Sequence, residues 1–318
     1  MSDHELYDLG DLALQDGDTL RAARLAYKTY GSLDATRSNA IVVPSAYGGT
    51  HADNEWLIGA GKALDPARYF IVATNMFGNG LSTSPSGLPA GTAFPNVTVY
   101  DNVKAQYRLT TEKFGVNKIA LVTGFSMGAQ QSYHWACAYP ELVERIAPVC
   151  GSARTSVHNG VFIDGIAATL RAFGTQTIGR LWAPWGMSAS FYRTEAWREI
   201  GFASAQAFVD EWYGTSFDGD PNDLLAMFWT WRHADISANE RFSGDFVAAL
   251  KSIQARAFVM PSATDTYFPP EDSEIEVRHL SRGELLVIPS VWGHAAGSGQ
   301  SPKDAPFIDS ALARLLAS

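Results

Sequence analysis

The sequence predicts a protein of the α/β class, in which a mostly parallel β-sheet is flanked by helices. Short and almost wholly apolar runs, bounded by turn residues, alternate with helical stretches along the chain. Strands that are covered by helices on both faces have this composition, whereas a strand with one wet face alternates apolar and polar residues. Hydrophobic residues make up 46% of the chain and charged residues 18%, which provides enough apolar surface for a sizeable core.

Six of these runs are expected to form the parallel strands. They occupy residues 40–46, 69–75, 118–125, 145–151, 255–263 and 284–290. Ahead of them, residues 12–31 alternate around Asp16-Gly17, a pair that favours a tight turn, so an antiparallel hairpin is expected to precede the parallel series.

A different pattern separates the fourth and fifth of these runs. Between about residues 152 and 250 the strand pattern stops, six tryptophans accumulate and the apolar periodicity becomes helical. Because the strand series resumes at Ala255, we interpret this segment as a helical cap inserted into the sheet domain. The predicted division is therefore a core of residues 1–152 and 250–318, and a cap of residues 153–249.

Charge and composition favour a small-molecule partner. The formal net charge of -9 and the absence of clustered Lys and Arg argue against a nucleic-acid binder. No stretch of eighteen uncharged apolar residues suggests a membrane span, and the acidic start lacks the features of a secretory signal, so we expect a cytoplasmic protein. Cys137 and Cys150, the only cysteines, are interpreted as structural residues.

Ser126 is the candidate nucleophile. Residues 124–128 read Gly-Phe-Ser-Met-Gly, a G-x-S-x-G motif, with an apolar strand before it and a helical stretch after it. A nucleophile elbow needs this context, because the strand-to-helix turn exposes the hydroxyl while the two glycines allow close backbone packing. The motif in this setting predicts the α/β-hydrolase fold, with a cap inserted into its mostly parallel sheet.

A serine hydroxyl requires a histidine base and an acid that orients the base. In this fold the chain order is serine, acid, histidine, and the last two follow late strands. Asp265 directly follows the run 255–263, and His294 follows the run 284–290. His279, the other late histidine, lies in a charged helical stretch, so Asp265 and His294 are the predicted partners of Ser126.

The backbone amides of Tyr47 and Met127 are the predicted oxyanion hole. Met127 follows the nucleophile, and Tyr47 lies in the Ser-Ala-Tyr-Gly-Gly loop after an early strand. His51 lies close to that loop and is a candidate for substrate contact. The remaining histidines lack metal-ligand spacing and no phosphate loop is evident, so neither a metal nor a cofactor is predicted.

Several longer stretches are familiar as a set: YKTYGSLDATRSNAIVV at 27–43, GKALDPARYFIVATNMFGNGLSTSPSG at 61–87, GFSMGAQQSYHWACAYPELVERI at 124–146, ARTSVHNGVF at 153–162 and DTYFPPE at 265–271. In them the chain resembles the homoserine O-acetyltransferase family of α/β-hydrolase-fold acyltransferases, over most of its length. The resemblance implies the same triad, Ser126 with Asp265 and His294, and the same oxyanion hole. It also implies a homodimer formed through the cap.

Two departures from that family concern the acceptor site. The family carries an aspartate directly after the catalytic histidine, where this chain has Ala295. It also carries a cap arginine eight residues before a Tyr-Arg pair, a spacing that falls at about Trp185 here, with Arg180 displaced along the helix. Losing both charged contacts removes roughly 3 kcal/mol of acceptor recognition, so homoserine is not the expected acceptor. Trp185 and Arg180 stay candidates for contact with another substrate.

Three functions stay open at this point. The first is an esterase-like serine hydrolase that forms an acyl-enzyme on a small, largely apolar acyl substrate, because the cap is rich in aromatic residues. The second keeps the acyl-enzyme but transfers the acyl group from an acyl-coenzyme A to a hydroxyl other than that of homoserine. The third is a member of the fold that binds a small ligand without catalysis. Covalent labelling of Ser126 and acceptor-dependent thiol release distinguish them.

Overall fold

The strands predicted from the sequence join one sheet. In the computed structural model, which describes residues 3–318, its eight strands lie in the order β1-β2-β4-β3-β5-β6-β7-β8. The strands β3 to β8 pair in parallel, and the predicted hairpin joins β4 antiparallel through β2. The strands are β1 (Glu5–Ala13), β2 (Thr19–Tyr30), β3 (Ala40–Pro44), β4 (Phe70–Thr74), β5 (Ile119–Phe125), β6 (Arg145–Val149), β7 (Arg256–Val259) and β8 (Gly283–Leu285).

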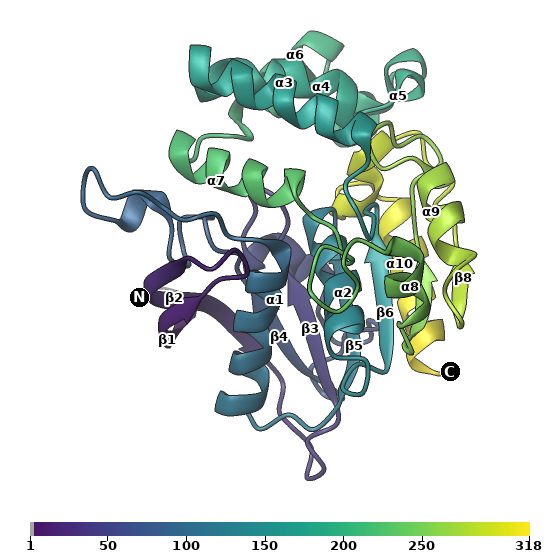
Figure 1. Ribbon diagram of the computed structural model, residues 1–318. Coiled ribbons are helices and arrows are strands. Elements are labelled where there is room, and N and C mark those ends of the chain that lie inside the picture. Colours follow the sequence, from purple (N-terminus) through teal and green to yellow (C-terminus); the bar gives the residue numbers. More distant parts are fainter. Residues whose placement is uncertain (1–2) are drawn as a thin grey trace.

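Helices cover both faces of this sheet (Figure 1). In β3, the fully buried Ile41 and Val43 join the core beneath α10, whereas Ala40 and Val42 join the core beneath α1 and α2. This alternation is the pleat of a strand with two dry faces, which is why its sequence is apolar throughout. The core helices are α1 (Val99–Arg108), α2 (Met127–Ala138), α8 (Phe246–Lys251), α9 (Pro270–Val277) and α10 (Asp304–Leu316).

Short helical turns complete the core and connect its elements. They are the 3-10 helices η1 (His51–Leu57), η2 (Pro85–Gly87) and η6 (Gly293–Ser298), and the π-helical turn η3 (Leu109–Lys113) that continues α1.

The cap lies between β6 and β7 and sits beyond one end of the sheet, as Figure 1 shows. Its helices are α3 (Val157–Phe173), α4 (Thr175–Gly186), α5 (Ala189–Arg193), α6 (Ala205–Glu211) and α7 (Pro221–Arg232), with the 3-10 helices η4 (Ala196–Ile200) and η5 (Tyr213–Thr215). The last part of the predicted cap, residues 234–249, packs back on the sheet. Ile236 and Ala249 there are buried in the core beneath α1 and α2. The division at 153–249 therefore stays a prediction.

The last two strands are shorter than their apolar runs suggest. Pairing between these runs continues beyond β7 and β8, because Leu286 N donates to Val259 O and Ile288 N donates to Pro261 O. Pro261 and Pro289 have no N–H to donate, so the ladder becomes irregular there. The irregular stretch leads into the two loops that carry Asp265 and His294.

Among the described residues, no helix combines the length and the apolar character that crossing a bilayer requires.

Candidate active site

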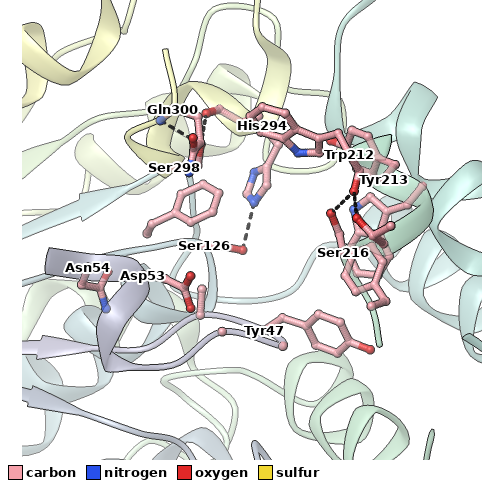
Figure 2. A pocket seen from close by; sticks show the side chains of 18 of the residues that line it. Tyr47, Asp53, Asn54, Ser126, Trp212, Tyr213, Ser216, His294, Ser298 and Gln300 are labelled. Atoms are coloured by element: carbon pink, nitrogen blue, oxygen red, sulfur yellow. Dashed lines mark hydrogen bonds between the residues drawn. The ribbon is translucent and has the colours of Figure 1, made fainter. Parts of the chain in front are cut away.

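Ser126 occupies the turn between β5 and α2, where the motif predicts it. Its backbone angles, φ 58° and ψ −120°, are strained for a residue with a side chain. The turn is held by neighbouring backbone, since Ser126 N donates to Val149 O at 2.9 Å and Ala129 N donates to Ser126 O at 2.9 Å. This geometry directs the hydroxyl into the cavity beneath the cap, where Figure 2 shows it.

The glycines of the motif permit close backbone contacts around the serine. A Cβ on Gly124 would lie 2.7 Å from the carbonyl carbon of Gly128, and a Cβ on Gly128 would lie 2.6 Å from the carbonyl oxygen of Pro44. Real Cβ atoms do not tolerate backbone atoms at such distances. The two glycines are therefore needed for α2 to pack against β5 and β3.

Asp265 and His294 complete a chain of hydrogen bonds to the serine. His294 Nε2 lies 2.9 Å from Ser126 Oγ, and His294 Nδ1 lies 2.7 Å from Asp265 Oδ2. The other carboxylate oxygen of Asp265 accepts the amides of Tyr267 at 3.1 Å and Phe268 at 3.0 Å. With Nδ1–H donating to the carboxylate, Nε2 is free to accept the serine proton. The structure thus brings the three predicted residues together.

The loops that carry the acid and the histidine are joined through one side chain. Thr264 Oγ1 donates to Ser290 O at 2.9 Å and accepts from Gly293 N at 3.0 Å. Thr264 directly precedes Asp265, and Gly293 directly precedes His294. This hydroxyl therefore fixes the spacing of the acid and the base.

The cap is attached to the same two loops. Ser188, which caps α5, donates to Val291 O at 2.6 Å, and Thr266 donates to Trp185 O at 2.8 Å. At Gly293, where φ is 60°, a Cβ would lie 2.8 Å from Gly186 O. The cap and the loops of the triad therefore form one packed unit.

Tyr47 and Met127, the predicted oxyanion donors, both lie beside the nucleophile. Met127 is the first residue of α2, where amides have no acceptor within the helix and the helix dipole favours negative charge. Tyr47 lines the same cavity as Ser126, and its hydroxyl is directed away, donating to Leu224 O at 3.3 Å. Its ring stacks on Phe228 at 4.4 Å, and burial raises the pKa of its hydroxyl well above the usual value. These side-chain contacts fix the position of the loop, and the backbone of Tyr47 stays available for contact with the substrate.

The cavity above Ser126 measures about 710 Å³ and is bounded by core loops and by the cap. Figure 2 shows Asp53 and Asn54 on the η1 side, Trp212, Tyr213 and Ser216 on the cap side, and His294 above Ser126. Other aromatic walls come from Trp182, Phe217, Trp231 and Tyr267. Ala295 also lines the cavity, so the position after the histidine faces the substrate with a methyl group.

For His51 the sequence interpretation needs correcting. Its ring is buried behind the cavity wall, with Nδ1 3.1 Å from Asn75 Nδ2 and Nε2 3.3 Å from Asp3 Oδ2. It does not line the cavity at Ser126. The capping box at the start of η1, made by Thr50 and Asp53, turns the helix so that Asp53 faces the cavity instead.

The two candidate residues of the cap, Arg180 and Trp185, also lie outside the catalytic cavity. Arg180 is exposed and paired with Asp210 at 2.6 Å. Trp185 lines a separate cavity behind Asp265, with His158 and Thr266. On α4 it is Trp182 that reaches the catalytic cavity, because a residue three positions earlier lies about 60° away around the helix.

Sequence reasoning missed Thr264, Asp53, Glu211 and Gln300. All but Thr264 line the cavity. The position of Thr264 beside the predicted acid was the only available signal. The others come from three segments that are distant in sequence, and no motif marks them.

Two further groups of reactive side chains lie outside the triad. Asp3, His51 and Glu55 offer ligand atoms within 4.8 Å of one another, but Lys28 Nζ already lies 2.6 Å from Glu55 Oε1 and 3.4 Å from Asp3 Oδ2. The Lys28 ammonium therefore already neutralises these carboxylates, in the place that a metal cation would take. Cys137 and Cys150 are buried, and burial raises the pKa of both thiols, which fits the structural role predicted for them.

This fold and this site define the class of the serine-nucleophile α/β hydrolases. A family profile described as alpha/beta hydrolase fold matches residues 39–297, and the chain belongs to that family.

Two of the named relatives match nearly the whole chain, and a third matches about half of it. It is 38% identical to an ethyl acetate hydrolase of Pseudomonas veronii, over 99% of this chain and 95% of that protein. It superimposes on the solved structure of the acetyl esterase MekB with a TM-score of 0.96 and 37% identity, covering 100% of this chain and 97% of that one. A homoserine O-acetyltransferase of Thermobifida fusca is 40% identical over 46% of this chain and 43% of that protein. The resemblance predicted from the sequence is confirmed.

Proposed function

We propose that this protein is a serine esterase that hydrolyses small, largely apolar esters, with acetyl esters as the first class to test. The observation that carries the proposal is the chain of hydrogen bonds from Ser126 through His294 to Asp265 at the floor of a cavity. Two relatives that match nearly the whole chain, an ethyl acetate hydrolase and an acetyl esterase, support the choice of substrate.

Acylation begins when Ser126 Oγ attacks the ester carbonyl carbon and His294 Nε2 takes the serine proton. Asp265 stabilises the imidazolium through the 2.7 Å hydrogen bond to Nδ1. The amides of Tyr47 and Met127 donate to the oxyanion as the carbonyl becomes tetrahedral. Collapse of this intermediate breaks the ester C–O bond, and the leaving alcohol takes the proton from His294.

Deacylation repeats these steps with water. His294 removes a proton from a water molecule as the water oxygen attacks the acyl carbon. His294 then gives this proton to Ser126 Oγ as the acyl group leaves. The net reaction converts ester and water to acid and alcohol. Nothing beyond the triad and water is required.

The cavity lining favours water over the acyl acceptor of the acetyltransferases. Ala295 places a methyl group where that family places a carboxylate, and Trp182 rather than an arginine faces the cavity from α4. No Lys or Arg belongs to the cavity lining over residues 3–318, so the phosphates of a coenzyme A donor have no cation to bind there. Transfer from acyl-coenzyme A is therefore the weaker of the two proposals.

The test compares wild type with Ser126→Ala on ethyl acetate and 4-nitrophenyl acetate. We expect wild type to release acetate and Ser126→Ala to lose at least about 10³-fold in kcat. A fluorophosphonate probe should label wild type at Ser126 only. Turnover that survives in a folded Ser126→Ala variant contradicts the proposal. Thiol release from acetyl-coenzyme A that depends on an added alcohol favours transfer instead.

Location and assembly stay predictions. A cytoplasmic enzyme is proposed on the sequence features given above. A homodimer through the cap is proposed from the family resemblance, and the exposed Val157, Val161 and Phe173 on α3 support it, at 85%, 64% and 72% exposure. Sedimentation of wild type beside Val161→Glu tests it, since a cap-mediated dimer should dissociate in the variant and a monomeric wild type would refute it.

A further inference from the structure

The catalytic cavity has charge of one sign only. Asp53 of η1 and Glu211 at the end of α6 line it from opposite sides, and over residues 3–318 no Lys or Arg lines it. Both carboxylates are exposed. A cleft lined by one sign of charge concentrates ligands of the opposite sign.

Neither carboxylate is neutralised by a neighbour in the described chain. Asp53 Oδ2 accepts from the backbone N of Thr50 at 2.7 Å and lies 3.4 Å from its hydroxyl, which are neutral donors. Glu211 takes part in none of the ion pairs found within residues 3–318, whereas the preceding Asp210 is paired with Arg180. Both groups therefore keep their negative charge at the cavity wall.

Two lysines, Lys62 and Lys303, are engaged outside the cavity. Lys62 Nζ donates to the carbonyl oxygen of Trp56, and Lys303 Nζ lies 2.7 Å from Glu199 Oε1. Neither ammonium lines the cavity, although Trp56 itself does.

The aromatic lining adds a second, independent attraction for a cation. Trp182, Trp212 and Phe217 line the cavity; the faces of Trp182 and Phe217 cover each other, with centroids 4.5 Å apart, so Trp212 is the ring of the three left for a cation. The faces of aromatic rings attract ammonium groups, and quaternary ammonium groups in particular. Such rings favour an apolar alcohol as well, so the carboxylates are what distinguish a cationic from an anionic substrate.

The alcohol portion is the part of the ester that meets these charges. It leaves before deacylation, and water must then reach the acyl-enzyme, so the alcohol occupies the side of the cavity open to solvent. Asp53, Glu211 and Gln300 are exposed residues of the lining, so solvent reaches the part of the wall that they form.

We propose that the cavity selects esters of ammonium-bearing alcohols over esters whose alcohol portion carries a carboxylate. This inference rests on the proposed esterase function and specifies its substrate class. The reaction is unchanged: the ester C–O bond breaks, water supplies the hydroxyl of the acid, and the alcohol leaves with its charge intact.

The experiment measures kcat/KM for three acetyl esters of similar size: acetylcholine, the neutral 3,3-dimethylbutyl acetate and the anionic 3-acetoxypropanoate. The readout is the ratio of kcat/KM for the cation to that for the anion, compared between enzymes so that the intrinsic reactivity of each ester cancels. Glu211→Gln should lower this ratio about 3- to 5-fold, and Glu211→Lys about 10- to 25-fold, as expected for unit charges some 8 Å apart in a wet cleft. Added salt at about 0.5 M should reduce the wild-type ratio.

Glu199→Gln is the matched control, because it removes an exposed carboxylate that is paired with Lys303 outside the cavity. Its ratio should equal that of wild type. A ratio that is unchanged in Glu211→Lys, while 3,3-dimethylbutyl acetate is still hydrolysed, overturns the charge preference alone. Hydrolysis of the simple acetyl esters but of none of these three overturns the charge preference, and failure to hydrolyse all of them overturns the proposed function.

Discussion

Replacing Thr264 with valine should slow the chemical step without weakening substrate binding. The hydroxyl makes two hydrogen bonds, to Ser290 O at 2.9 Å and from Gly293 N at 3.0 Å, and valine keeps the shape while removing both. One lost hydrogen bond costs about 1 kcal/mol, and a partner left unsatisfied costs about 1–3 kcal/mol. If misalignment of His294 raises the activation free energy by about 2–3 kcal/mol, kcat falls roughly 30- to 150-fold.

The assay separates alignment from binding and from folding. Thr264 does not line the cavity, so KM on ethyl acetate should stay within about twofold while kcat falls. The rate of Ser126 labelling by a fluorophosphonate should fall in parallel with kcat. Thr264→Ser retains the oxygen and should recover most of the activity. Thr169→Val, which removes a hydroxyl bonded only to Gly165 O on α3, is the control for the substitution type. A folded Thr264→Val enzyme with wild-type kcat would refute the reasoning.

Three further predictions concern the glycines, a buried acid and the oxyanion loop. Gly128→Ala would place its Cβ 2.6 Å from Pro44 O and should destabilise the fold by several kcal/mol. A Cβ on Gly165 would meet nothing within 4 Å, so Gly165→Ala should raise the free energy of unfolding by about 0.5–1 kcal/mol. Thermal unfolding of both variants tests this. Burial raises the pKa of Glu276 to about 8, so the folded state holds a proton that the unfolded state loses near pH 4.5. Stability should therefore fall as pH rises from about 4.5 to 8, by up to about 5 kcal/mol, and Glu276→Gln should flatten this slope in pH-dependent melts. Tyr47→Phe should cost about 1 kcal/mol of stability but leave kcat within about threefold, because the backbone amide and not the hydroxyl binds the oxyanion; a large loss of kcat would contradict that role.

The triad was predictable because its positions follow from the order of strands. Ser126 follows its apolar run directly, Asp265 after one residue and His294 after three, and the ends of parallel strands meet at one edge of a sheet. The strand lengths were less predictable, since Pro261 and Pro289 break the ladder within runs that are mostly apolar. The physical rule that gave the site was therefore topological, and it did not depend on exact strand boundaries.

The cavity lining was not predictable by the same rule, because it depends on how the cap helices rotate and dock. Trp182 and Trp185 are three residues apart on one helix, yet only Trp182 reaches the catalytic cavity. Arg180 is held by Asp210, a residue of a different helix, and this contact exists only once α4 and α6 have packed. Tertiary contacts of this kind leave no periodic signal in a sequence.

The attachment of the cap to the triad loops links substrate range to catalysis. Gly186, at the end of α4, lies so close to Gly293 that a Cβ on Gly293 would be 2.8 Å from the carbonyl oxygen of Gly186. The neighbouring Trp185 O accepts a hydrogen bond from the hydroxyl of Thr266. The same helix supplies Trp182 to the cavity wall. A substitution that enlarges the cavity by shifting α4 must therefore also shift the residues beside His294 and Asp265. Selection for larger substrates should accordingly favour replacement of wall side chains that leave the backbone of α4 in place, because only those changes alter cavity volume without altering the alignment of the acid and the base.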